Sequence, residues 1–246
     1  MYMNSFNFLE FIENTNKAES NEELFHTLRH SLVQFGYDLV TYSLLSSHDS
    51  FGLKAEDGIL QDCPEGWFEY YFGKGYQHID PRVLFGRKHN MPFYWQDIKK
   101  HTALSKKGEQ VLNEANEAGL YAGIGIPIHG HLNELAGVSL ASSYKDVKKD
   151  HHLLSLMYCM MHQFHLSYCT LNKKSIPQQD CVHLTARETE VLKWCGFGKS
   201  NWDISKILSI SEHGVEYHLR NIYRKLNVNT RIGAVSNALR RGYIDC

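Results

Sequence analysis

Four side chains in the first hundred residues have types and spacings that suit a binding site for a small molecule. Trp67 and Tyr71 are four residues apart, so on a helix they project from one face, and Asp80 and Trp95 follow along the chain. An indole N–H and a phenol O–H donate hydrogen bonds, whereas an ionised aspartate accepts them. Because a carboxylate among aromatic rings is costly unless it is paired, we expect these residues to line a cavity whose guest supplies a donor to Asp80.

Two interpretations in which the same residues have only a structural role remain open. A Trp and a Tyr at helical spacing are common core residues, so both rings can simply fill the protein interior. Asp80 precedes Pro81, and its carboxylate can accept from backbone N–H groups and fix an Asp-Pro turn without facing a guest. A solid interior with Asp80 turned towards water would exclude a receptor.

The elements that must hold these side chains can be anticipated from the spacing of apolar residues. Residues 6–37 predict two helices, the second capped by Ser20 and ended by Gly36. The remaining patterns predict helices at 64–72, 105–118 and 150–168 and strands at 37–45, 123–128 and 135–141, the last two as an antiparallel hairpin. Together they predict an α+β fold, with an α/β/α sandwich around an antiparallel sheet.

Charge is distributed unevenly along the chain. The 246 residues have a net charge of -1 and 43% apolar composition, which is enough for two domains with separate cores. Residues 181–246 hold 10 Lys and Arg against 6 Asp and Glu, whereas the rest hold 16 against 21. The stretch 172–180 is polar, contains Pro177 and lacks periodicity, as linkers do. We therefore expect an acidic domain at 1–171, a linker at 172–180 and a basic domain at 181–246, where an anionic partner would dock.

The basic domain shows repeated helix starts. Thr185 and Glu188 form a capping box, and Ser200 and Ser211 open two further helices. A fourth helix is predicted at 231–241. In the third helix, apolar residues at i, i+4, i+7 and i+11 form one buried face and leave a charged one: Val215, Leu219, Ile222 and Leu226.

Two short helices joined by a tight turn, the second of them basic, fit a helix-turn-helix whose second helix enters the DNA major groove. The alternative is a small helical bundle with solvated charges. In that case Glu216 and Arg220 only pair with each other across one helical turn, at about 0.2–0.5 kcal/mol.

Residues 184–244 resemble the helix-turn-helix domain of the LuxR family of bacterial transcription factors, through the segments LTARETEVL, GKS and HLRNIYRKL. The resemblance implies a homodimer on double-stranded promoter DNA, with RNA polymerase as a further partner. It places Glu216 and Arg220 at base edges, where a carboxylate can accept a hydrogen bond from cytosine N4 and a guanidinium can donate two to guanine. Gly214 and Asp203 stand where the family usually has threonine and glutamate. Phosphate contacts are implied for Lys199, Ser200, His213, Tyr217, Arg224 and Lys225.

The spacing of Trp67, Tyr71, Asp80 and Trp95 resembles that of the N-acyl-homoserine lactone pocket in the quorum-sensing branch of that family. The signature of that pocket, W-x3-Y-x8-D-P-x13-W, is met without a gap. The resemblance implies that 1–171 is an autoinducer-binding domain. Trp67 and Tyr71 would donate to the ligand, Asp80 would accept from its amide and Trp95 would pack on the lactone ring. A regulator of the same build that answers another small molecule, or none, is the alternative. Ser139 is expected to supply a further hydroxyl, and Tyr42, Leu44 and Ile126 are expected at the acyl tail. Cys63 is a further expected contact and stands where many relatives carry an aromatic residue.

Other kinds of chemistry have weaker support. Cys159, His162 and His165 share a predicted helix, but no second segment supplies further metal ligands at a recognisable spacing, so we expect no metal. The sequence lacks HExxH, GxSxG and Walker-type motifs, so we expect neither an enzyme nor a cofactor. The six cysteines form no CxxC pair, and no apolar run is long enough to span a membrane. These features, with the resemblance, predict a cytoplasmic protein.

Overall fold

The computed structural model describes residues 6–55, 59–130, 134–144, 149–174 and 183–245. The chain divides into two compact units, Met1–Ser175 and Ile176–Cys246. Part of the stretch expected as a linker, 175–180, and the tip of the expected hairpin turn, 131–133, lie outside the described residues. Among the described helices, none combines the length and the apolar character needed to cross a membrane.

A five-stranded antiparallel sheet forms the centre of the first unit, with its strands in the order β2-β1-β5-β4-β3. The hairpin of β4 and β5 was expected, and both strands are eight residues long. The edge strands β2 and β3 are short and were not predicted. The strands are β1 (Leu39–Leu44), β2 (Ile59–Asp62), β3 (Phe93–Tyr94), β4 (Ala122–His129) and β5 (Leu135–Ser142).

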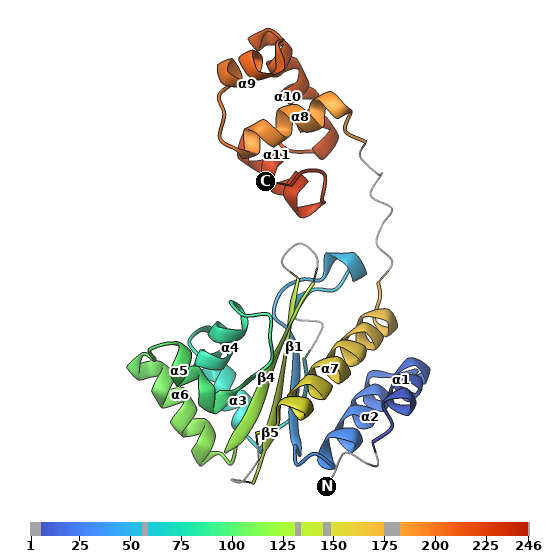
Figure 1. Ribbon diagram of the computed structural model, residues 1–246, viewed down its shortest axis with the longest axis vertical. Helices are drawn as coiled ribbons and strands as arrows, with labels where there is room; N and C mark the ends of the chain where they lie inside the picture. The colour runs from blue at the N-terminus through green and yellow to red at the C-terminus, as the bar shows by residue number, and fades with distance from the viewer. Residues whose placement is uncertain (1–5, 56–58, 131–133, 145–148, 175–182, 246) are drawn as a thin grey trace. The chain divides into compact units, whose positions relative to one another are not determined.

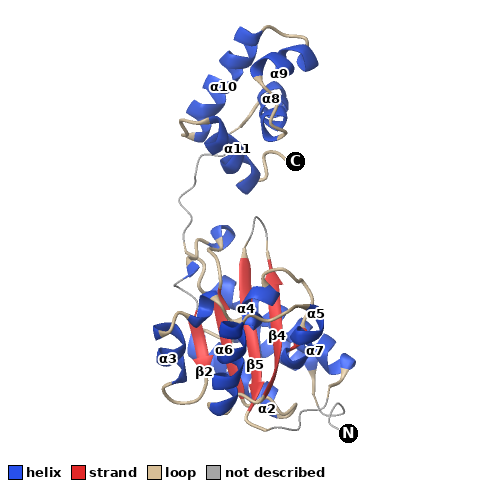
Figure 2. Ribbon diagram, turned by 90° about the vertical axis from the view of Figure 1, so that its left-hand side faces the viewer, coloured by secondary structure: helices blue, strands red, loops and turns tan. Residues whose placement is uncertain are grey.

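Helices cover both faces of this sheet, which confirms the expected α+β sandwich (Figure 1). On one face lie α1 (Phe8–Lys17), α2 (Asn21–Val33) and the long α7 (His151–Leu171), with Asn7, Ser20 and Asp150 as their N-caps. The other face carries the helices that lie between β2 and β4 in the chain (Figure 2). These are α3 (Trp67–Gly73), α4 (Pro81–Gly86), α5 (Ile98–His101) and α6 (Lys106–Glu117).

Strand register separates the two faces chemically. Tyr42 pairs with Val138, which pairs with Ile126, so these three side chains share the face that packs on α7 and belong to the main hydrophobic core. Thr41 pairs with Ser139 and therefore lies on the opposite face, towards α3 and α4. The alternation of strand side chains thus gives one apolar face, which packs in the main core, and one more polar face.

Two glycines of β4 let aromatic rings approach the backbone closely on that second face. A Cβ at Gly125 would come within 2.3 Å of the Phe93 ring, and one at Gly123 within 2.5 Å of Trp95. Both distances are far inside van der Waals contact. Trp95 can therefore be positioned beside the sheet only because β4 has no side chain beneath it.

The second unit is a four-helix domain with its own core. Its helices are α8 (Ala186–Gly196), α9 (Asn201–Leu208), α10 (Glu212–Leu226) and α11 (Arg231–Arg240). The expected capping box of Thr185 and Glu188 is present, and Ser200 forms a second one with Asp203. The apolar stripe of α10 is buried against the other helices, as its spacing predicted: Val215, Leu219, Ile222 and Leu226.

Candidate functional site

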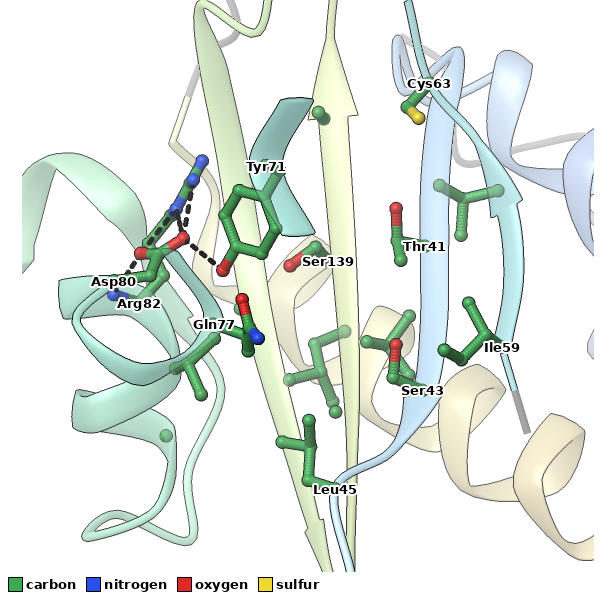
Figure 3. Close-up of a pocket in the computed structure, with 18 of the residues that line it drawn as sticks. Thr41, Ser43, Leu45, Ile59, Cys63, Tyr71, Gln77, Asp80, Arg82 and Ser139 are labelled. Carbon is green, nitrogen blue, oxygen red and sulfur yellow. Dashed lines mark hydrogen bonds and ion pairs between the residues drawn. The ribbon is translucent and has the colours of Figure 1, made fainter. Parts of the chain in front are cut away.

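A cavity of about 380 Å³ lies between the second face of the sheet and helices α3 and α4. A volume of this size is in the range of small-molecule sites. Figure 3 shows side chains from β1, β2, β5 and the α3–α4 segment pointing into it. Its wall is largely apolar, and its polar lining residues are Thr41, Ser43, Asp62, Cys63, Tyr71, Gln77, His78, Asp80, Arg82, Arg87 and Ser139.

Asp80 is buried at one end of this cavity, with 2% of its surface exposed. It is the N-cap of α4, and its carboxylate accepts from the backbone N–H of Arg82 at 2.8 Å. The Tyr71 hydroxyl donates to the same carboxylate at 2.9 Å. Burial and the neighbouring Asp80 charge raise the pKa of Tyr71 well above its usual range, so Tyr71 stays a donor.

Arg82 is the counterion of Asp80 and was not anticipated from the sequence. Its Nε and Nη2 donate to the carboxylate at 3.0 and 2.7 Å, and Arg82 itself is only 8% exposed. The guanidinium lies 4.5 Å from the centre of the Trp95 ring, a cation–π contact. Burial opposes the charge on Arg82, but Asp80 outweighs this and raises the pKa of the guanidinium. The site therefore contains a paired carboxylate, not a lone one.

Most of the expected ligand contacts do meet at this cavity. Trp67, Tyr71 and Asp80 lie on α3 and at the start of α4, Trp95 follows β3, and Ser139 faces them from β5. Cys63 lines the wall next to β2, with its thiol 2.9 Å from Gln61 Oε1.

Of the residues expected at the acyl tail, Tyr42 lies away from the cavity, whereas Leu44 and Ile126 border it from the α7 face of the sheet. Tyr42 is fully buried on the α7 face of the sheet, where its hydroxyl shares a 2.8 Å hydrogen bond with His165 Nδ1. Ile126 borders the cavity, but its register places its side chain on the same α7 face. The sequence-based prediction assumed that the acyl tail lies on the apolar face of each strand. The cavity instead lies on the side that carries Leu39, Thr41 and Ser43.

Two buried polar atoms at the cavity wall have no hydrogen-bond partner among the described residues. One is the indole Nε1 of Trp95, a donor, and the other is the side-chain Oε1 of Gln77, an acceptor. A buried polar group without a partner costs about 1–3 kcal/mol. Both atoms are therefore places where a bound molecule would gain by supplying a partner.

A second buried polar cluster lies behind the sheet. His165 on α7 packs against His48, with ring centres 5.1 Å apart, and His48 is fully buried. Burial, with His48 and His162 nearby, lowers the pKa of His165 to about 3. The ring is therefore neutral at physiological pH.

The expected absence of a metal concerned a nearby part of α7. Cys159 is exposed, and His162 Nδ1 lies 2.9 Å from the Tyr158 carbonyl. Within the part of the chain that the structure describes, no three His, Cys, Asp or Glu side chains are grouped so as to hold a metal ion.

In the second unit, helix α10 presents an exposed polar face opposite its buried stripe. Glu216 and Arg220 form an ion pair at 3.0 Å across one turn. Both are well exposed, so the pair contributes only about 0.3–0.5 kcal/mol and separates at little cost. Other exposed residues of this face are His213, Tyr217 and Arg224.

Two residues expected at phosphates make contacts within the domain. The Lys225 ammonium donates to the buried Glu188 carboxylate at 2.6 Å and to the His183 carbonyl at 3.0 Å. Ser200 is occupied as the cap of α9, although it and Lys199 remain exposed. Lys225 thus has a structural role that its position on a basic helix did not reveal.

Comparison with known proteins agrees with this architecture. A family model for the autoinducer binding domain matches residues 20–168, and a model for bacterial regulatory proteins of the luxR family matches 182–238. The transcriptional activator protein LuxR of Aliivibrio fischeri is 37% identical over 200 residues, which cover 79% of this chain and 78% of that protein. The transcriptional activator protein BjaR1 of Bradyrhizobium diazoefficiens is 30% identical, with 96% of both chains covered.

Solved structures show the same fold at lower identity. Escherichia coli SdiA superposes with a TM-score of 0.63 at 22% identity, with 97% of this chain and 99% of that chain covered. SdiA in complex with octanoyl-rac-glycerol gives a TM-score of 0.62 at 21% identity, with 97% of both chains covered. The two matched family models and the identity to LuxR show that this chain belongs to the LuxR family of autoinducer-binding transcriptional regulators and is not an enzyme.

Proposed function

We propose that residues 1–171 bind an N-acyl-homoserine lactone and that residues 181–246, joined to them through 172–180, bind promoter DNA as part of a homodimer. The relatives named as transcriptional activators suggest that this regulator also activates transcription, through contact with RNA polymerase in the cytoplasm. The observation that carries the proposal is the cavity of about 380 Å³, which places Trp67, Tyr71, Asp80 and Trp95 at one end.

The donors and acceptors of that end suit an amide-linked lactone. Four donors already fill the Asp80 carboxylate: the backbone N–H, Nε and Nη2 of Arg82, and the Tyr71 hydroxyl. Tyr71 is the donor that can leave without breaking either the ion pair or the N-cap of α4. We infer that the ligand amide N–H takes its place on Asp80, while the freed hydroxyl donates to a ligand carbonyl. The exchange keeps every polar group paired.

The other ligand carbonyl requires a second donor. Trp67 lines the cavity with its ring against Tyr70 and Tyr71, and the unpartnered Nε1 of Trp95 lies at the same end. Binding would also fill a mostly apolar void and stabilise the folded sensor, by about 2.7 kcal/mol at a ligand concentration one hundred times Kd.

Trp67→Phe tests the lactone part of this proposal. It keeps a ring against Tyr71 but removes the indole N–H, so we expect lactone affinity to fall about 5- to 150-fold, the equivalent of 1–3 kcal/mol. The measurement is the ligand-induced rise in melting temperature as a function of lactone concentration. Trp202→Phe makes the same change at an exposed position in the other unit and should leave the titration unchanged. Equal affinity of Trp67→Phe and the wild-type chain would contradict the assigned role.

Arg220→Ala tests the DNA part. Loss of a guanidinium at a guanine edge should weaken binding to a selected site about 5- to 150-fold and relax the base preference at one position. DNA sites would first be selected by the full chain from a random library, and then compared by gel shift at several salt concentrations. Arg29→Ala removes the same charge from the first unit and serves as the control. An unaltered base preference in Arg220→Ala would count against α10 as the recognition helix.

A second candidate function is a regulator of the same build whose signal is not a lactone. It is favoured by one observation: Arg82 already neutralises the carboxylate that the lactone amide would need. Mass spectrometry of the molecule that copurifies with the chain, expressed with extract of producer cells, would decide between the two signals.

A further inference from the structure

Gln77 is a polar part of the cavity wall that the lactone contacts leave unused. It lies in the short helical turn η3 (Tyr76–His78), three residues before Asp80. Its Nε2 is 3.3 Å from His78 Nε2, whereas its Oε1 is buried and has no partner within the described parts of the chain. Figure 3 shows the Gln77 amide below the Tyr71 ring, pointing into the cavity.

The position of Gln77 separates it from the head-group end. In Figure 3 its amide lies between the Asp80–Arg82 pair and the part of the cavity that Ser43 and Leu45 line. A ligand whose amide binds at Asp80 and whose chain extends towards Leu45 would pass Gln77 with its first carbon atoms. The Gln77 amide is therefore placed to meet the acyl chain close to the amide.

An unsubstituted chain gives this amide nothing to bond to. A methylene at Gln77 would keep Oε1 buried and unpaired, at a cost of about a tenfold or greater loss of affinity relative to a ligand that pairs it. A carboxamide can serve two kinds of oxygen group: its carbonyl accepts from a hydroxyl, and after rotation by half a turn its NH₂ donates to a ketone. His78 tolerates both orientations, because either tautomer of its ring can face the amide.

We propose that Gln77 is a specificity-determining residue that selects a signal bearing an oxygen substituent, hydroxyl or ketone, on the acyl chain near its amide. This inference rests on the proposed lactone function. It adds a discrimination that the head-group residues cannot make, since Trp67, Tyr71 and Asp80 contact the part that is common to all N-acyl-homoserine lactones.

The test is a binding titration of the full chain with three lactones of one chain length: unsubstituted, 3-hydroxy and 3-oxo. We expect the wild-type chain to bind one of the oxygenated ligands at least about tenfold more tightly than the unsubstituted one. Gln77→Met, which has similar length without hydrogen-bonding groups, should reduce that preference to less than about threefold. The change should come chiefly from weaker binding of the oxygenated ligand, because Oε1 is already unpaired in the unliganded chain. Gln34→Met makes the same change at the exposed end of α2 and should keep the wild-type preference.

Each outcome of this titration has a definite meaning. A ketone preference shows the NH₂ facing the ligand, and a hydroxyl preference shows the carbonyl facing it. Equal binding of all three ligands by the wild-type chain, tightest binding of the unsubstituted one, or an undiminished preference in Gln77→Met would overturn the role of Gln77 while leaving the lactone function intact. Failure of all three to bind would instead overturn the lactone function, and the role of Gln77 with it.

Discussion

Replacing Arg82 with methionine should lower the free energy of unfolding of the first unit by about 3–5 kcal/mol, because it leaves the Asp80 carboxylate buried without a counterion. Both members of the pair are less than a tenth exposed, so water cannot take the place of the guanidinium. The Trp95 ring would also lose its cation–π contact. Urea unfolding of the full chain, followed by tryptophan fluorescence, measures the change in the transition of this unit.

The double variant Asp80→Asn with Arg82→Met separates a charge effect from a packing effect. It removes both charges, and buried ion pairs replaced as a pair often cost little. We therefore expect the double variant to be more stable than Arg82→Met alone. If the single variant unfolds at the wild-type urea concentration, Asp80 does not depend on Arg82. For the same reason Asp80→Asn alone is a poor test of lactone binding, since it leaves the Arg82 guanidinium buried and unpaired.

Acid should destabilise the first unit through His165. Burial lowers the pKa of this residue from 6.5 to about 3, so between these values the unfolded chain binds a proton that the folded chain does not. The stabilisation is complete above pH 6.5 and is lost as the pH falls towards 3, at up to about 1.4 kcal/mol for each pH unit. Unfolding free energies measured by urea titration between pH 7 and pH 4.5 would show this slope.

His165→Gln isolates this contribution from that of the carboxylates. Glutamine does not titrate, and it can still hydrogen-bond to the Tyr42 hydroxyl that lies 2.8 Å from His165 Nδ1. We expect the variant to lose less stability than the wild-type chain over the same pH range. His30→Gln on the surface of α2 should follow the wild-type curve. Parallel curves for His165→Gln and wild type would show that His165 is not the acid-sensitive group.

The main elements of the fold could be predicted from the sequence because their signals are local. Serine and threonine before an apolar stripe are common helix caps, and Ser20, Thr185 and Ser200 cap α2, α8 and α9. The long strands β4 and β5 show a clear alternation of apolar residues. The short strands β2 and β3 lack such a signal, since four and two residues fix no period. They form because the hairpin and β1 offer them backbone partners.

The candidate site was only partly predictable, and the errors have physical causes. Trp67, Tyr71, Asp80 and Trp95 share a spacing that can be read in one dimension. The choice between Tyr42 and Thr41 depends instead on which strand face meets α3, which no local pattern shows. Arg82 was missed because a cation two residues after an aspartate is common on protein surfaces. Here Pro81 and the start of α4 turn it inward onto Asp80.

Gly123 and Gly125 of β4 limit which side chains of the cavity wall can vary. Any side chain larger than hydrogen at Gly123 or Gly125 would displace Trp95 or Phe93, so this wall of the cavity cannot change at these positions. The opposite wall is less constrained, because Ile59 belongs to the short edge strand β2 and Cys63 follows directly after it. Related receptors that bind a different signal would therefore be expected to differ around Ile59 and Cys63 and to keep glycine at the positions of Gly123 and Gly125.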